Sequence, residues 1–114
     1  MRLADVHRTE HDGAEVVALT GEIDISNTER IRRAVTQAMS NRSIALILDL
    51  SGVDFIDSAG IQLIYQLRED LRARGQVLRL VIPSRAPTID ALRLAGVIGH
   101  VEITESVVAA LRKV

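Results

Sequence analysis

The sequence predicts a single α/β domain with a mixed central sheet, in which an N-terminal antiparallel hairpin precedes alternating strands and helices. Two observations predict this class: short apolar runs alternate with longer segments of helical periodicity, and an Asp-Gly turn joins the first two runs. With 114 residues, 47% of them hydrophobic, the chain is long enough for one core and too short for two. The expected order is ββαβαβαβα in one domain over residues 1–114.

The N-terminal segments are expected to pair as antiparallel strands. Residues 3–9 and 15–20 have the pattern of strands, and the turn between them contains Asp12 and Gly13. Asp-Gly between two strand-like runs strongly indicates a hairpin, because both residues accept the positive φ that a tight turn requires. The sequence therefore predicts an antiparallel pair at the start of the sheet.

A first helix is expected after Gly21, where the apolar spacing changes from two residues to three or four. Ser26 and Glu29 have the spacing of a capping box, which predicts Ser26 as the N-cap. The helix should end near Asn41. Its core-facing side is expected to carry four apolar residues, namely Ile31, Val35, Ala38 and Met39.

The rest of the chain is expected to alternate between buried strands and helices. The apolar run 44–48 predicts a central strand covered on both faces, followed by a loop through which Val53 and Phe55 continue the alternation. Residues 77–82 and 101–103 predict two more strands. Three further helices are expected. The first stops at Gly75 and has four inward residues, Ile61, Ile64, Leu67 and Leu71. The second has Pro87 in its first turn, finishes at Gly96 and carries Ile89, Leu92 and Ala95, and the third is capped by Thr104 and holds Val107, Val108 and Leu111.

Composition and charge argue against several classes of function. The net charge is −1, from 14 basic and 15 acidic residues, so the chain lacks the basic excess of a nucleic-acid-binding protein. The absence of cysteine excludes disulfides, thiolate catalysis and cysteine-ligated metals. No apolar run is long enough to span a bilayer, and residues 1–10 lack the apolar core of a signal peptide. We therefore expect a cytoplasmic monomer that binds neither membrane nor cofactor.

Two catalytic interpretations find little support. Ser58 as a hydrolytic nucleophile would need a base and an oxyanion hole, but none of the three histidines lies at a strand end beside it. The Gly-x-Ser-x-Gly elbow is missing as well. His7 and His11 lie in the hairpin without a placed fourth ligand, so no metal site is expected. We therefore predict that the protein is not an enzyme.

Two turns that follow strands and precede helices are the candidate functional segments, since open α/β sheets place such loops beyond the carboxyl ends of their strands. They are residues 21–24 and residues 54–60. In the second turn, Ser58 is expected at or near the helix N-cap, and Gly60 leaves room for an anion near free backbone N–H groups. Taken alone, these residues are better explained as a plain helix cap, because most serines at helix starts have only that role.

The wider pattern resembles a known family. Residues 49–61, Asp-Leu-Ser-Gly-Val-Asp-Phe-Ile-Asp-Ser-Ala-Gly-Ile, closely resemble the signature of the STAS family, the sulfate transporter and anti-sigma factor antagonist domains. Residues 21–24, Gly-Glu-Ile-Asp, resemble the upstream Gly-Glu-Leu-Asp segment of that family. The order and spacing of the elements match over essentially the whole chain. The resemblance implies a bacterial anti-sigma factor antagonist of the single-domain type.

The resemblance also implies a regulatory site. Ser58 is then the phosphate acceptor, the anti-sigma factor is itself the serine kinase, and a phosphatase removes the phosphate. Ala59 stands where the family often has a second hydroxyl residue, which leaves Ser58 as the one candidate in the loop. The unmodified chain is expected to bind the anti-sigma factor and free the sigma factor. The contacts expected from the resemblance are made by Asp24, Asp57, Ser58, Ala59 and Gly60, although Asp24 is explained equally well as an ordinary turn carboxylate.

Related functions remain open within the same family. STAS-like domains also act as stressosome subunits and as partners of transport ATPases. An accessory subunit of a transport ATPase, or a stressosome-type scaffold component, is therefore the alternative interpretation. A neighbouring gene for a kinase-type anti-sigma factor would favour the antagonist, and a neighbouring permease gene would favour transport.

Overall fold

The protein is described here by a computed structural model that places residues 5–113. The elements along these residues are β1 (Asp5–His11), β2 (Ala14–Ile23), α1 (Thr28–Ala38), β3 (Ala45–Ile56), α2 (Ser58–Arg72), β4 (Val77–Val81), α3 (Ile89–Leu94), the 3-10 turn η1 (Val97–Gly99), β5 (Glu102–Thr104) and α4 (Val107–Arg112).

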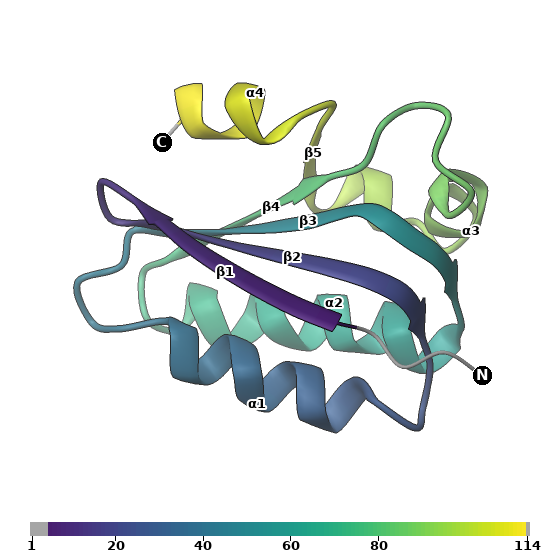
Figure 1. The fold of residues 1–114 in the computed structure, drawn as a ribbon, viewed down its shortest axis with the longest axis horizontal. Coiled ribbons are helices and arrows are strands. Elements are labelled where there is room, and N and C mark those ends of the chain that lie inside the picture. Colours follow the sequence, from purple (N-terminus) through teal and green to yellow (C-terminus); the bar gives the residue numbers. More distant parts are fainter. Residues whose placement is uncertain (1–4, 114) are drawn as a thin grey trace.

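The five strands form one sheet in chain order, β1-β2-β3-β4-β5. β1 pairs antiparallel with β2, and every other neighbouring pair is parallel. Figure 1 shows α1 and α2 side by side under one face of the sheet, α4 over the other face, and α3 at the end of the sheet where β3 leads into α2. The predicted class, an α/β domain with a mixed sheet and an N-terminal hairpin, is confirmed.

The hairpin turns at the predicted residues. Asp12 has φ 51° and Gly13 has φ 92°, the two consecutive positive values of a type I′ turn. Asp5 lies opposite Thr20, and the pairing continues without a break to the turn. The expected start of the first strand, at Leu3, lies outside the described residues. β2 continues three residues beyond its expected end, to Ile23.

β3 is longer than expected, and the predicted loop through Val53 and Phe55 is wrong. Both residues belong to the strand, which runs to Ile56. The register between β2 and β3 shifts twice, once between Ala18 and Thr20 and once just after Gly21. Each shift breaks the alternation of inward and outward side chains. Val53 and Ile56 are buried while Phe55 is exposed, so the alternation of Val53 and Phe55 in the sequence does not match the two faces of the strand. The extended strand brings the chain directly to the start of α2.

The two C-terminal helices begin later than predicted. Pro87 lies before the N-cap of α3, Thr88, and is not in the first turn. Thr104 is the last residue of β5, and its buried hydroxyl donates to the carbonyl of Leu80 across the sheet (3.3 Å). The N-cap of α4 is Ser106, whose hydroxyl oxygen accepts from the N–H of Ala109 at 3.1 Å. Both predictions missed the start of the helix by two residues.

The main core lies between the sheet and the α1–α2 layer. The four apolar residues predicted to face the core from α1 are all buried, as are Ile64, Leu67 and Leu71 of α2. Ile61 is only partly buried and packs at the edge of this cluster, while Leu63 is buried instead. A smaller cluster lies under α4. Within the described part of the chain, no helix is both long enough and apolar enough to cross a membrane.

Candidate functional site

The two turns selected from the sequence lie next to each other in the structure. β2 and β3 are parallel neighbours whose last residues, Ile23 and Ile56, lie opposite each other. The backbone N–H of Asp57 then donates to the carbonyl of Ile23 at 3.2 Å. The β2–α1 turn and the start of α2 therefore form one continuous surface at the carboxyl ends of the strands.

Asp57 is the N-cap of α2, a role that the sequence pattern had suggested for Ser58. Its Oδ1 accepts a hydrogen bond from the N–H of Gly60 at 3.0 Å. Its Oδ2 accepts from the N–H of Ile25 in the neighbouring turn at 3.4 Å. One carboxylate therefore satisfies a free donor of the helix and also ties the two turns together.

Ser58 is the first residue of α2, and its side chain is exposed. Because Asp57 provides the cap, the Ser58 hydroxyl is not needed to hold the helix start. An exposed hydroxyl at the first position of a helix is reachable by a kinase. Phosphate there would lie beside the positive end of the helix dipole.

The β2–α1 turn is held by buried polar side chains. Asp24 is 6% exposed, and its Oδ1 accepts from the N–H and the hydroxyl of Ser26. Asn27 is 1% exposed; its Oδ1 accepts from the N–H of Asp24 (3.1 Å), and its Nδ2 donates to the carbonyl of Glu22 (2.7 Å). The carboxylate of Asp24 thus shapes the turn from inside, as the turn-carboxylate interpretation predicted.

The expected capping box at Ser26 is wrong. The Ser26 hydroxyl turns back to Asp24, and Asn27 occupies the N-cap position of α1. From the sequence, Asn27 was expected to point outward from the first helix, but it is buried at the N-cap position, where Asn is a common residue. Its bonds to Glu22 and Asp24 lock the turn instead of capping the helix.

Gly60 is required by packing. A Cβ built on Gly60 would collide with Cγ1 of Ile56 and lie 3.0 Å from Cγ2 of Ile23. The space left by the missing side chain therefore faces the core, and the expectation that it opens a path for an anion is wrong. The glycine instead lets the start of α2 lie close against the ends of β2 and β3.

Two exposed apolar residues lie near Ser58 and were not selected from the sequence as contact residues. Ile25 is 81% exposed and Phe55 is 51% exposed. Ile25 follows the buried Asp24, and Phe55 precedes the capping turn by two residues. The sequence contains no clear indication of their exposure, because both lie in apolar patterns that are typical of a core. Ala59, beside them, is half-buried.

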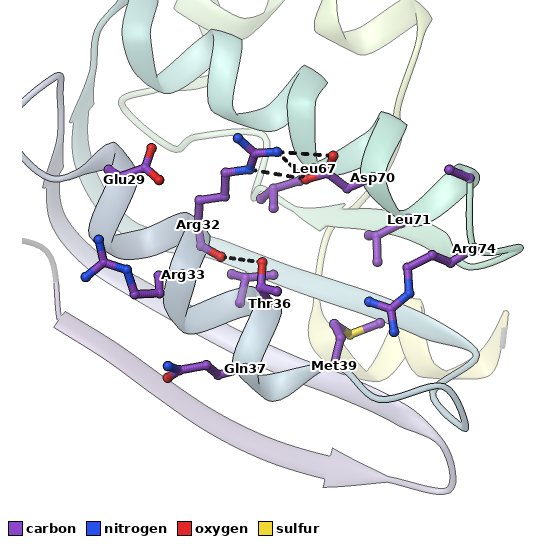
Figure 2. Close-up of a pocket in the computed structure, with 12 residues that line it drawn as sticks. Glu29, Arg32, Arg33, Thr36, Gln37, Met39, Leu67, Asp70, Leu71 and Arg74 are labelled. Carbon is purple, nitrogen blue, oxygen red and sulfur yellow. Dashed lines mark hydrogen bonds and ion pairs between the residues drawn. The ribbon is translucent and has the colours of Figure 1, made fainter.

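A groove runs between α1 and α2 from this surface; we call it the α1–α2 groove. It begins in a hollow of about 270 Å³ lined by Ile25, Ala59 and Leu63, among others. It continues into a larger hollow of about 570 Å³, shown in Figure 2, and both hollows are lined by Glu29 and Arg32. In the described residues, no group of three side chains capable of holding a metal ion occurs.

Comparison with known proteins places the chain in a family. The STAS domain family matches residues 5–110, and the chain belongs to it. The chain is 28% identical over 76 residues to anti-sigma-F factor antagonist RsfB of Mycobacterium tuberculosis, an alignment that covers 67% of this chain and 60% of RsfB. It is 41% identical over 71 residues to osmosensory protein A of the same species, covering 62% of this chain and 44% of that protein.

Solved structures show the same architecture. The crystal structure of an anti-sigma factor antagonist from Mycobacterium paratuberculosis is similar with a TM-score of 0.86 and 26% sequence identity, over 98% of this chain and 94% of that one. The match to RsfB covers 60% of that relative's length, and the match to osmosensory protein A covers 44%.

Proposed function

We propose that this protein is an anti-sigma factor antagonist whose affinity for its partner is controlled by phosphorylation of Ser58. One observation carries the proposal: an exposed serine lies at the first position of α2, directly after a turn whose cap is provided by another residue. A group can therefore be added to this hydroxyl without removing a bond that holds the fold. Membership of the STAS family and the similarity to antagonists from mycobacteria support the same function.

The proposed cycle has two states. The unmodified protein binds the anti-sigma factor, which releases the sigma factor. The anti-sigma factor, acting as a serine kinase, then transfers the γ-phosphoryl group of its bound ATP to Oγ of Ser58, with loss of the hydroxyl proton and release of ADP. The phosphorylated protein dissociates, and a phosphatase restores the first state by hydrolysing the phosphoserine. This chain supplies the hydroxyl and the binding surface, and we place the cycle in the cytoplasm.

The fold should tolerate the phosphate. A phosphoserine carries about −1.5 to −2 charges. The N-terminus of α2 favours that charge by roughly 0.3–1 kcal/mol, while the carboxylate of Asp57 opposes it. The two contributions partly cancel, so the free energy of unfolding should change little.

The partner interface should be much more sensitive than the fold. A unit negative charge on the partner about 8 Å from the phosphate costs on the order of 2 kcal/mol at an effective dielectric constant near 20. With nearly two charges on the phosphate, the penalty approaches about 3–4 kcal/mol, or several hundredfold in affinity. Phosphorylation should therefore control binding without unfolding the domain.

The residues around Ser58 then have separate roles. Ser58, Ala59 and the exposed part of Asp57 are proposed to touch the partner, because their side chains reach the surface. Asp24 and Gly60 are buried, so their contribution to binding is proposed to be indirect, through the shape of the two turns. Substitutions at these two positions should lower stability as well as affinity.

The proposal is tested by phosphorylation and by charge substitution. The protein is incubated with ATP and with each kinase-type anti-sigma factor of its source, and the phosphate is located by peptide mass spectrometry. Phosphate on Ser58 is expected, and modification elsewhere would contradict the site. Ser58→Ala should bind the anti-sigma factor, and Ser58→Glu should bind poorly.

A matched control separates the position of the charge from its presence. Val108 on α4 is 58% exposed and lies over the opposite face of the sheet (Figure 1). Val108→Glu adds the same charge far from Ser58 and should bind like the parent protein. If Ser58→Glu binds as tightly as Val108→Glu, the charge mechanism is wrong.

A further inference from the structure

The α1–α2 groove begins beside the phosphorylation site. Its first hollow is lined by Ala59, the residue after Ser58, and by Ile25 from the adjoining turn. Glu29 and Arg32 also line the second hollow, which extends along the two helices to Met39 and Arg74. A partner that covers Ser58 can therefore extend into this groove without leaving the surface of the protein.

Ile25 provides an apolar contact at the mouth of the groove. Its side chain is 81% exposed, yet its backbone is fixed by the hydrogen bond from its N–H to Asp57. The residues on both sides of it belong to the turn that Asp24 and Asn27 hold. An exposed isoleucine on a held backbone loses little backbone entropy when a partner covers it, which favours its use as an anchor.

The far part of the groove has an excess of positive charge. Arg32 is neutralised by Asp70, to which it donates from Nε (3.2 Å) and from Nη2 (2.9 Å), as Figure 2 shows. Arg74 donates to the neutral amide of Asn41 at 2.9 Å, so its charge is not cancelled by that contact. Arg33 also lines this hollow, at its outer edge on α1, and is exposed. Of the acidic lining residues, Asp70 pairs with Arg32, which leaves Glu29 to oppose Arg33 and Arg74.

We propose that the α1–α2 groove receives an acidic segment of the anti-sigma factor, with an apolar side chain against Ile25 and carboxylates facing Arg33 and Arg74. This inference rests on the proposed function and names the surface through which it acts. A phosphate on Ser58 places negative charge at the end of the groove that the acidic segment enters, so the segment is repelled.

The occupancy of the groove can be measured by alkylation of single cysteines, because the natural chain contains none. Thr36→Cys and Gln62→Cys place a thiol in each hollow, and Val108→Cys places one on α4. Each variant is treated with iodoacetamide in the presence and absence of the anti-sigma factor that phosphorylates Ser58. Both groove cysteines should be protected by the partner, and the cysteine on α4 should react equally in both conditions.

Affinity measurements with matched substitutions complete the test. Ile25→Ser should weaken binding by about tenfold or more, because it removes most of the apolar area that the isoleucine would bury against the partner in the complex. Arg33→Glu combined with Arg74→Glu should weaken it by at least about tenfold, and more strongly at low salt. The controls are Leu94→Ser, an exposed apolar residue outside the groove, and Arg85→Glu, an exposed basic one; both should bind within about twofold of the parent protein.

The possible outcomes separate the two proposals. If the parent protein binds the anti-sigma factor while the groove variants bind equally well and both groove cysteines stay reactive, the groove proposal is overturned and the antagonist function stands. If the parent protein binds none of the kinase-type anti-sigma factors of its source, both proposals fail. Thermal melting of each variant, expected near that of the parent, shows that a loss of binding does not come from unfolding.

Discussion

The carboxylate of Asp57 accepts a hydrogen bond from the backbone N–H of Ile25, a residue 32 positions earlier in the chain (3.4 Å). The same carboxylate caps α2 through the N–H of Gly60. The conformation of the β2–α1 turn is therefore tied to the start of the helix that carries Ser58. The two segments that the sequence identified separately are therefore joined by this residue into one continuous surface.

Asp57→Ala should destabilise the protein by about 1 kcal/mol, the usual cost of losing an N-cap side chain, with a fall in Tm of about 4 °C. It should also speed hydrogen exchange at the N–H of Ile25, which loses its acceptor. Asp90→Ala is the control, because the ion pair of Asp90 with Arg93 is exposed and its loss should change stability by less than about 0.5 kcal/mol. Equal Tm values for the two variants would show that Asp57 does not act as a cap.

Gly60→Ala should destabilise the protein by roughly 1–3 kcal/mol, because the added methyl group has no room between Ile56 and Ile23. Gly99→Ala is the matched control. A Cβ at Gly99 meets no atom within 4 Å, so this variant should be neutral or slightly more stable. Denaturant unfolding of the two variants measures the difference, and a Gly60→Ala protein as stable as Gly99→Ala would contradict the close packing of α2 against the strands.

The free energy of unfolding of Ser58→Glu should lie within about 0.5 kcal/mol of that of the parent protein. A carboxylate near the helix N-terminus is stabilised by the helix dipole, while Asp57 repels it. Thermal unfolding followed by circular dichroism measures this change. A loss of several kcal/mol would mean that the hydroxyl supports the fold, and that phosphorylation acts by unfolding.

The stability contributed by Glu102 should depend on pH. The hydrogen bond from Lys113 is the largest influence on the pKa of Glu102 and lowers it. Burial opposes this effect, and the positive charges of Arg79 and Lys113 lower the pKa further, so that it lies below its ordinary value. A carboxyl group whose pKa is lowered by folding stabilises the folded state. This contribution is fully present at pH values above the pKa of the unfolded state, roughly 4.3 for glutamate. It is lost as the pH falls through the lower pKa of the folded state.

The difference in unfolding free energy between the parent protein and Glu102→Gln should therefore be largest above about pH 5 and shrink in acid. Lys113→Met removes the largest cause and should flatten most of this dependence. Urea unfolding at a series of pH values measures both. A difference that is constant with pH would show that Glu102 titrates alike in the folded and unfolded states.

Local patterns were sufficient to predict most of the fold. The Asp12-Gly13 turn accepts only a narrow set of backbone angles, and the structure has the angles that were expected. The buried face of α1 follows directly from its helical spacing. The stretch from Ser51 to Ile56 was misread because two register shifts against β2 interrupt the alternation on which strand prediction depends. Such shifts depend on the partner strand, which a local pattern does not contain.

The two turns of the candidate site lie between strands and helices as predicted, but their internal organisation was not predicted. Ser58 and Asp57 are both good caps, and only the contact with the distant Ile25 shows why the carboxylate takes this role. In the same way, Asn27 and Ser26 compete for the start of α1, and the burial of Asp24 decides between them. The α1–α2 groove could not be predicted, because it depends on the distance between two helices.

The tight fit around Gly60 also limits which substitutions this domain accepts. Since the start of α2 is packed closely against the strands, changes at its buried side should be costly, whereas outward-facing side chains such as Ile25 and Gln62 can be replaced on an unchanged scaffold. The surface of the two turns and the packing beneath it can therefore vary independently.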